Sequence, residues 1–200
     1  MNKRLLAITL IFSLILLDQV SKIYIKLTMY MGEHFFYLGN WASIHFVENE
    51  GMAFGLSFGS GIGKLLLTIF RIVVVGFIAY YIFHQIKQKK ANTFFVVCLS
   101  MIFAGAIGNI IDSIFYGVLF SESTPMQIAT IFPEQGYAPL LKGRVVDMFY
   151  FPLYQGILPG WMPVFGGKFV EFFPYIFNLA DAYITVGVAL LLLFQKKILG

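Results

Sequence analysis

The chain has 200 residues, of which 59% are hydrophobic and 12% are charged, and its mean hydropathy is +0.82. A soluble domain cannot bury that much apolar surface, so the composition excludes a soluble protein and indicates an integral membrane protein. The formal net charge of +4 comes from Lys and Arg residues that flank apolar stretches, which fits membrane orientation and does not indicate binding of nucleic acid.

Four apolar stretches approach the roughly 20 residues that a helix needs to cross a bilayer core of about 30 Å. They cover residues 5–25, 65–83, 94–115 and 175–194, with bounds that are approximate. We therefore predict a membrane all-α bundle of four transmembrane helices that forms a single domain over residues 1–200. No small-x-small cleavage motif follows Leu17, so the first helix is expected to remain uncleaved.

Basic residues gather at three of the segments that flank or join these stretches. They are Lys3 and Arg4 before the first stretch, Lys87, Lys89 and Lys90 after the second, and Lys196 and Lys197 after the fourth. The positive-inside rule therefore predicts that both termini are cytoplasmic. The segments 26–64 and 116–174 are then expected on the outer face, in contact with membrane lipids.

The two outer segments have the composition of strands and loops. In the first, Ala42, Ile44 and Phe46 alternate with polar residues, and Trp41 suits the headgroup region of a bilayer. The second is rich in proline and is expected to be mostly loop. Together they predict a small periplasmic cap of β-sheet and loops on the helices.

Four aspartates are expected to lie near one end of the bundle. Counted at about 1.5 Å per helical residue, Asp18, Asp112 and Asp181 each lie toward the outer end of their stretch, with Asp181 about six residues into the fourth. Asp147 lies within a short strand-like run, residues 143–148, at the same end. An ionisable group within a span costs about 2.5–3.5 kcal/mol on insertion scales, so each of these acids is a candidate for function.

An alternative is that some of these acids only hold the helices together as ion pairs. Lys22 lies one helical turn after Asp18, and Arg71 or Arg144 is available to pair with Asp112. The remaining cations are too few to neutralise every acid, so ion pairing does not account for all four of them.

Two carboxyl groups brought close together share one proton, because both cannot ionise comfortably at short range. Such a pair activates a water molecule and protonates a leaving amine, which suits peptide hydrolysis without a metal or cofactor. Other hydrolytic sites lack parts in this sequence. His34, His45 and His84 do not have metal-ligand spacing, Cys98 is the only cysteine, and no serine lies in a Gly-x-Ser-x-Gly motif.

Five sequence blocks in order carry a family resemblance across nearly all of the chain. They are residues 18–22 (DQVSK), 47–55 (VENEGMAFG), 105–112 (GAIGNIID), 143–147 (GRVVD) and 177–184 (FNLADAYI). Any one block is a weak signal, but five in order are highly specific. The chain resembles the lipoprotein signal peptidases, type II, which are aspartyl proteases of the bacterial inner membrane.

The resemblance implies that Asp147 and Asp181 form a catalytic dyad that hydrolyses the peptide bond before a diacylglyceryl-modified cysteine. It also implies prolipoprotein substrates, no cofactor or metal, and a monomer in the inner membrane with its active site near the outer face. The residues expected to bind substrate or support the dyad are Asp18, Lys22, Asn49, Asn109, Asp112, Arg144 and Asn178.

The chain departs from the family pattern at two points. The family commonly has Arg directly after the aspartate of the third block, and this chain has Ser113. Asp112 is therefore expected to find another cation, with Arg71 and Arg144 as the candidates. The segments before Gly143 and before the last block are longer than is usual in the family, which predicts elaborated outer loops.

Two other classes of function remain open at the level of sequence. A small proton-coupled transporter or channel would relay protons through its intramembrane acids, but those acids would be spread across the bilayer, and no inverted repeat is visible here. A non-enzymatic assembly factor would use the polar residues only for helix packing. It predicts that Asp-to-Asn changes at positions 147 and 181 leave function intact.

Overall fold

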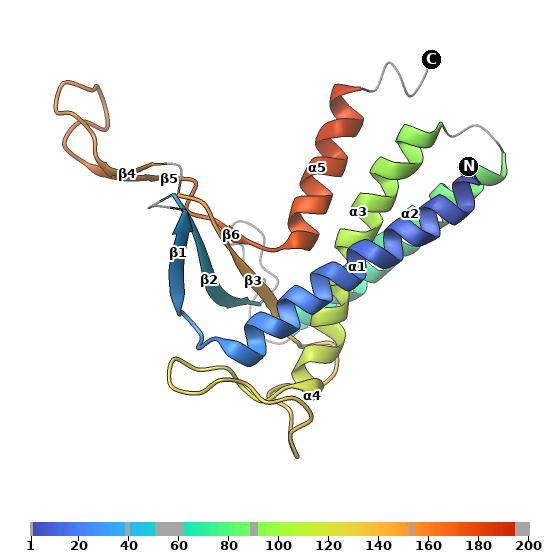
Figure 1. Cartoon of the computed structure of the whole chain (residues 1–200), viewed down its shortest axis with the longest axis horizontal. Coiled ribbons are helices and arrows are strands. Elements are labelled where there is room, and N and C mark those ends of the chain that lie inside the picture. The colour runs from blue at the N-terminus through green and yellow to red at the C-terminus, as the bar shows by residue number, and fades with distance from the viewer. Residues whose placement is uncertain (1, 39–40, 51–61, 89–91, 153, 195–200) are drawn as a thin grey trace.

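The computed structural model describes residues 2–38, 41–50, 62–88, 92–152 and 154–194. Helices gather at one end of the molecule and strands at the other, and the start of α1 and the end of α5 lie at the same end, far from the strands (Figure 1). The glycine-rich part of the first outer segment, including residues 51–55 of the second block, lies outside the described residues. So do Lys89, Lys90, Lys196 and Lys197.

Three helices are long and apolar enough to cross a membrane, over Lys3–Thr28, Gly63–Lys87 and Thr93–Leu119. The first is α1, Lys3–Thr28, and the second belongs to α2, Ile62–Lys87. The third comprises α3, Thr93–Ile111, a π-helical turn η1, Asp112–Tyr116, and α4, Gly117–Leu119. These three apolar helices agree with the first three predicted stretches and run a few residues beyond them at most ends.

The fourth predicted helix is shorter than expected and begins later. Helix α5 covers Leu179–Leu193, which is 15 residues. The prediction that it starts at residue 175 is wrong, because residues 176–177 form a strand and Asn178 caps the helix. The side chain of Asn178 accepts a hydrogen bond from the Asp181 amide, and the Asp181 carboxyl group accepts one from the Asn178 backbone N–H, which is a complete capping box.

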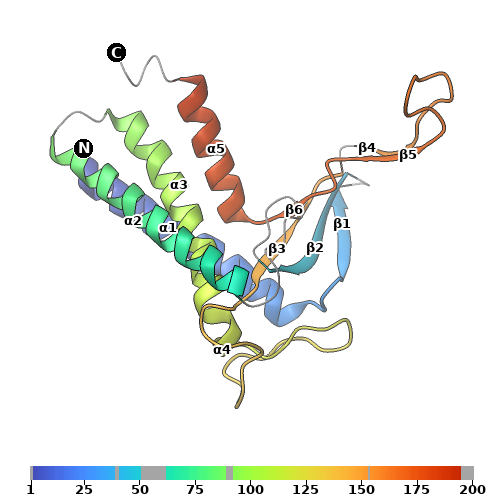
Figure 2. The ribbon, with the colours of Figure 1, turned by 180° about the vertical axis from the view of Figure 1, so that it is seen from behind.

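Glycines let the helices approach closely. Helix α3 lies between α5 on one side and α1 and α2 on the other (Figures 1 and 2). A Cβ atom at Gly105 would overlap the carbonyl oxygen of Ala180 at the start of α5. A Cβ atom at Gly108 would lie 2.5 Å from an Asp18 carboxyl oxygen of α1. Small residues at such contacts allow backbones to pack tightly where lipid offers no hydrophobic driving force.

Four strands form an antiparallel sheet in the order β1-β2-β3-β6. Their bounds are β1 His34–Leu38, β2 Ala42–Asn49, β3 Val145–Tyr150 and β6 Ile176–Phe177. The predicted small sheet is thus confirmed, but it takes β3 from the second outer segment and β6 from the start of the predicted fourth helix. The second outer segment also forms a separate hairpin of β4, Tyr154–Ile157, and β5, Phe169–Phe172, so the prediction that it is mostly loop is only partly right.

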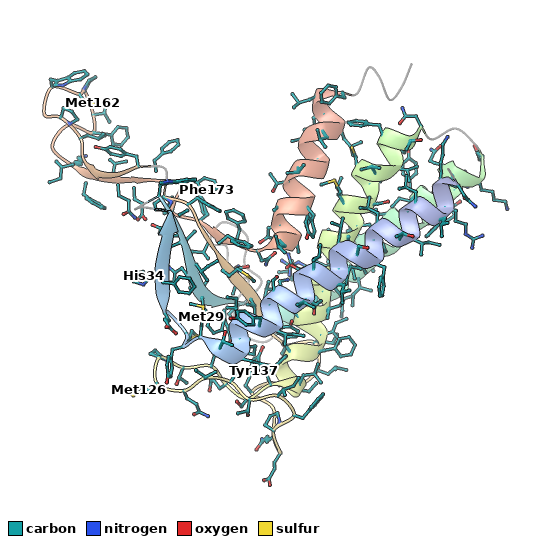
Figure 3. The ribbon with its side chains drawn as sticks, in the orientation of Figure 1. Met29, His34, Met126, Tyr137, Met162 and Phe173 are labelled. Atoms are coloured by element: carbon teal, nitrogen blue, oxygen red, sulfur yellow. The ribbon has the colours of Figure 1, made fainter. Side chains whose placement is uncertain are left out.

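A hydrophobic core joins the sheet to the helices. It contains Ile25, Met29, Phe46, Tyr116, Phe120, Val146 and Met148. Met29 lies where the end of α1 meets the sheet (Figure 3). Successive side chains of a strand point to opposite faces. Because Val146 and Met148 of β3 are both buried in this core, the residue between them, Asp147, faces the other way.

Candidate active site

The carboxyl group of Asp147 is held by two amide donors. Its Oδ1 accepts a hydrogen bond of 2.6 Å from Nδ2 of Asn178, and its Oδ2 accepts one of 3.2 Å from Nδ2 of Asn49. Asn49 is the last residue of β2, and Val47 of β2 is the partner of Asp147 in the sheet register. Strand pairing therefore brings the second and fourth sequence blocks together, and the side chain of Asp147 is only 3% exposed.

Asp181 lies in the first turn of α5, not six residues into a helix as predicted, because the helix begins at Leu179. Its Oδ1 accepts a hydrogen bond of 2.8 Å from Nδ2 of Asn109, and its Oδ2 accepts one of 3.3 Å from the backbone N–H of Asn178. The N-terminus of a helix carries partial positive charge, so this position suits a carboxylate.

Asn178 connects the two aspartates. Its Oδ1 accepts a hydrogen bond of 2.9 Å from the Asp181 amide, while its Nδ2 donates to Asp147 at 2.6 Å. The same Nδ2 lies 3.1 Å from Oδ1 of Asn109. Asn178 is fully buried, so water does not compete for these hydrogen bonds. One side chain thus caps α5 at the Asp181 amide and also binds the carboxyl group of Asp147.

The hydrogen bonds around Asp147 and Asp181 continue into a buried network whose cation is Lys22. Its Nζ lies 2.9 Å from Oδ2 of Asp18, 2.9 Å from Oδ2 of Asp112 and 2.9 Å from Oδ1 of Asn109. An ammonium group has three donors, and all three are used. Because Lys22 holds the oxygen of the Asn109 amide, the Nδ2 end of that amide is left to face Asp181.

The ion pair between Lys22 and Asp18 is confirmed, whereas the predicted partner of Asp112 is wrong. Asp112 pairs with Lys22 and not with Arg71 or Arg144. Asp112 directly follows α3, and the packing of α3 against α1 brings it to Lys22, which sequence spacing does not reveal.

Asp18 and Asp112 also hold backbone groups of the elements that carry the other two acids. Asp18 Oδ1 accepts from the Ala180 amide at 3.0 Å, and Asp112 Oδ2 accepts from the Val146 amide at 3.3 Å. Gln19, which the sequence analysis missed although it lies within the first block, donates to Asp112 Oδ1 at 2.9 Å and to Asp18 Oδ2 at 3.1 Å. The start of α5 and the strand β3 are thus fastened to the same buried cluster.

In the described part of the chain, the side-chain contacts of Arg144 lie outside this network, so its predicted role in binding substrate or supporting the dyad stays a prediction. Its guanidinium donates to Glu50 at 3.0 Å, to Glu122 at 3.2 Å and to Glu48 at 3.4 Å. Arg71 of α2 is the arginine near the two acids, since it lines their cavity and interacts electrostatically with both. The sequence analysis considered Arg71 only as a partner of Asp112.

Asp147 and Asp181 line one cavity of about 600 Å³. Its polar lining also includes Asn49, Arg71, Asn109 and Thr185, and its apolar lining comprises Val145, Phe173, Tyr175, Ile176, Phe177, Ala182 and Val186. Cavities of this size with a few convergent polar groups are typical ligand sites. Among the described residues, no group of three or more His, Cys, Asp and Glu side chains is placed to hold a metal ion.

The pKa of Asp147 is raised to about 7. Burial is the main cause, because it disfavours the charged form, and the negative charge of the neighbouring Asp181 is the second. A carboxyl group with this pKa keeps its proton at mildly acidic pH and is able to donate it. The cavity therefore contains a carboxyl group that is able to act as an acid, with a second carboxyl group, that of Asp181, beside it.

Comparison of the chain with known proteins identifies its family. The model of signal peptidase (SPase) II matches residues 10–196. The lipoprotein signal peptidase of Porphyromonas gingivalis is 50% identical over 92% of this chain and 79% of that protein, and the one of Amoebophilus asiaticus is 38% identical over 91% and 74%. A bacterial membrane enzyme solved by the in meso method at 2.3 Å resolution is 25% identical, with a TM-score of 0.61 over 96% of this chain and 87% of that one. The chain therefore belongs to the signal peptidase II family of membrane peptidases, as its five sequence blocks predicted.

Proposed function

We propose that this chain is an aspartyl endopeptidase that removes the signal peptide from diacylglyceryl-modified prolipoproteins, cutting before the lipidated cysteine. Asp147 and Asp181 form its catalytic pair. The observation that carries the proposal is that both carboxyl groups line one cavity and are hydrogen-bonded by the same buried residue, Asn178, whose side-chain amide donates to Asp147 and whose backbone N–H donates to Asp181. Membership of a membrane peptidase family supplies the reaction type, and these two acids supply groups that are able to perform it.

The proposed reaction needs one shared proton. Asp181 takes a proton from a water molecule as the water oxygen attacks the scissile carbonyl carbon, and Asp147 gives its proton to the carbonyl oxygen. The tetrahedral intermediate then collapses. The carbon–nitrogen bond breaks, the leaving amine takes the proton from Asp181, and Asp147 recovers a proton from a hydroxyl of the intermediate. Both acids return to their starting states.

The amides of the site orient these two acids. Asn109 donates to Asp181, Asn49 donates to Asp147, and Lys22 fixes the amide of Asn109 from behind. Groups that lock a reacting side chain in one geometry contribute strongly to rate, because the arrangement is formed before substrate arrives. We assign these residues to positioning, together with Asp18 and Asp112.

The location of the site suits a substrate that is anchored in lipid. The acids lie at the end of the helices that is next to the sheet, and α5 contributes Ala182, Thr185 and Val186 to the cavity wall. The acyl chains of a prolipoprotein then stay in the bilayer while its cleavage site enters from the side. We place this end at the outer face of the bacterial inner membrane, with four spans, both termini cytoplasmic and a monomeric enzyme.

The function is tested with purified protein in lipid and two forms of one precursor, with and without the diacylglyceryl group on the cysteine. We expect release of the signal peptide from the modified form and little release from the unmodified form, because the lipid anchor holds the cleavage site at the cavity. Release is followed by gel shift and mass spectrometry. Equal cleavage of both forms, or of neither by folded protein, would contradict the proposal.

The rate of cleavage is expected to fall as the pH rises through about 7. A raised pKa means that Asp147 holds the shared proton below that value and loses it above, and the doubly ionised pair has no acid for the carbonyl oxygen. Single-turnover rates measured from mildly acidic to alkaline pH in lipid check this. A rate that stays constant or rises across that interval would show that Asp147 is not the proton donor.

A further inference from the structure

A hairpin arm projects from the molecule and takes no part in the network around the acids. We define the arm as residues 154–172, formed by β4, β5 and the turn between them. It extends past β1, away from the helices, with Met162 near its far tip and Phe173 at its base (Figures 1 and 3). Its strands pair only with each other in the described structure.

The arm exposes an unusual amount of apolar surface. Its most exposed large side chains are Ile157 at 69%, Trp161 at 80%, Val164 at 77%, Phe165 at 55%, Phe169 at 67% and Phe172 at 63%. From residue 157 to 169 the only charged residue is Lys168. Many exposed apolar side chains on one short hairpin indicate a site of interaction with a protein or a membrane.

The turn at the end of the arm has a defined shape that satisfies backbone groups internally. The amide of Leu158 donates to the carbonyl of Lys168 at 3.0 Å, and the amide of Gly167 donates to the carbonyl of Leu158 at 2.9 Å. Met162 likewise accepts from Gly166 at 3.1 Å. Moving a hydrogen-bonded backbone group out of water costs less free energy than moving an unpaired one. A segment that enters lipid therefore needs its backbone groups paired in this way.

We propose that the tip of the arm inserts into the headgroup region of the same bilayer that the helices cross. The three apolar helices place a bilayer beside the arm, and the arm runs across the direction of the helix axes instead of continuing it (Figures 1 and 2). Trp and Phe side chains with a neighbouring Lys are the composition found at the membrane interface, where the cation meets lipid phosphates.

The insertion has a consequence for the cavity that holds the two acids. The chain leaves the arm at Phe172, and the residues that follow, Phe173, Tyr175 and Ile176, line that cavity. A tip anchored in the interface therefore keeps this wall of the cavity at the level of the lipid headgroups. The proposal itself rests on the arm and not on the identity of the catalytic pair.

Tryptophan fluorescence tests the insertion directly, because the chain has only two tryptophans, Trp41 and Trp161. The variant Trp41→Phe is reconstituted in vesicles of phosphatidylcholine and phosphatidylglycerol that carry a spin-labelled lipid. We expect Trp161 to be quenched several-fold more strongly by a label near the headgroup than by one at the end of the acyl chain, and to be protected from iodide in water. Subtraction of the fluorescence of Trp161→Phe from that of wild type also gives the quenching of Trp161, and it leaves Trp41 in place.

A matched control uses another outward position. Met126 is 92% exposed and lies on a different loop of the second outer segment (Figure 3). With both native tryptophans changed to Phe, Met126→Trp is expected to be quenched by iodide and not by the labelled lipids. The proposal is overturned if Trp161 behaves like this control, or if Trp161 becomes protected only after a precursor or another protein is added.

Discussion

Replacement of Asp147 or Asp181 with Asn is expected to lower the rate of prolipoprotein cleavage by about 10³-fold or more, since each change removes one partner of a proton-transfer pair. Asn has nearly the volume of Asp and is able to present its carbonyl oxygen to Asn109 or Asn178, so the fold should be retained. Single-turnover cleavage in lipid measures the loss, and thermal unfolding in detergent measures the stability of each variant.

The control for these two changes is Glu134→Gln, which removes the charge of an exposed acid in the second outer segment. It should cleave at the wild-type rate. Wild-type cleavage by a folded variant at position 147 or 181 would remove that residue from catalysis. If both variants kept full activity, the assembly-factor reading, in which the acids serve packing only, would have to replace the aspartyl mechanism.

Lys22→Met is expected to be the most destabilising single change in the network, at about 3–5 kcal/mol, because it leaves buried carboxylates without their cation. Lys22, Asp18 and Asp112 are all 1% exposed or less. Cleavage should fall as well, since the Asn109 amide loses the donor that fixes its orientation. Thermal unfolding of purified variants, together with single-turnover cleavage, provides the measurement.

Two comparisons separate this effect from the general loss of a lysine. Lys87→Met changes an exposed lysine at the end of α2 and should leave the unfolding temperature unchanged. Adding Asp112→Asn to Lys22→Met removes one of the stranded charges and should recover part of the lost stability. An unfolding temperature for Lys22→Met equal to that of Lys87→Met would contradict the role assigned to the buried ammonium group.

The long helices were predictable because hydropathy is a local property of the sequence. A run of apolar residues identifies α1, α2 and α3 wherever the rest of the chain lies. A constant rise per residue then places Asp18 and Asp112 at the same end of their helices. The strand that carries Asp147 was also visible as a short apolar run between turn residues.

The start of α5 was not predictable from the same signal. Residues 175–177 are as apolar as the helix that follows, but Ile176 and Phe177 pair with Tyr150 and Phe149 of β3. Strand pairing depends on a segment about 25 residues away in the chain, and hydropathy does not contain that information. The capping role of Asn178 was the available clue, since Asn followed three residues later by an acid is typical of a helix N-terminus.

The partner of Asp112 depended on packing between helices. Lys22 lies 90 positions earlier in the chain, and only the close contact of α1 with α3 brings the two side chains to 2.9 Å. Arg71 and Arg144 were reasonable candidates by charge and approximate depth, but Arg144 lies among three glutamates. Gln19 carries no charge, and its partner Asp112 lies 93 positions away on another helix, so the sequence does not show this contact.

The first turn of α5 has an unusual mechanical property. Helix ends are ordinarily the parts that fray first. Here the Ala180 amide donates to Asp18 of α1, and the Asp181 amide donates to Asn178, which also binds Asp147 of β3. The end of the helix is therefore bonded to two other elements. Fraying of this turn and separation of Asp181 from Asn109 become a single event. The rate of hydrogen exchange at these two amides would therefore measure how long the contact between Asp181 and Asn109 lasts between openings.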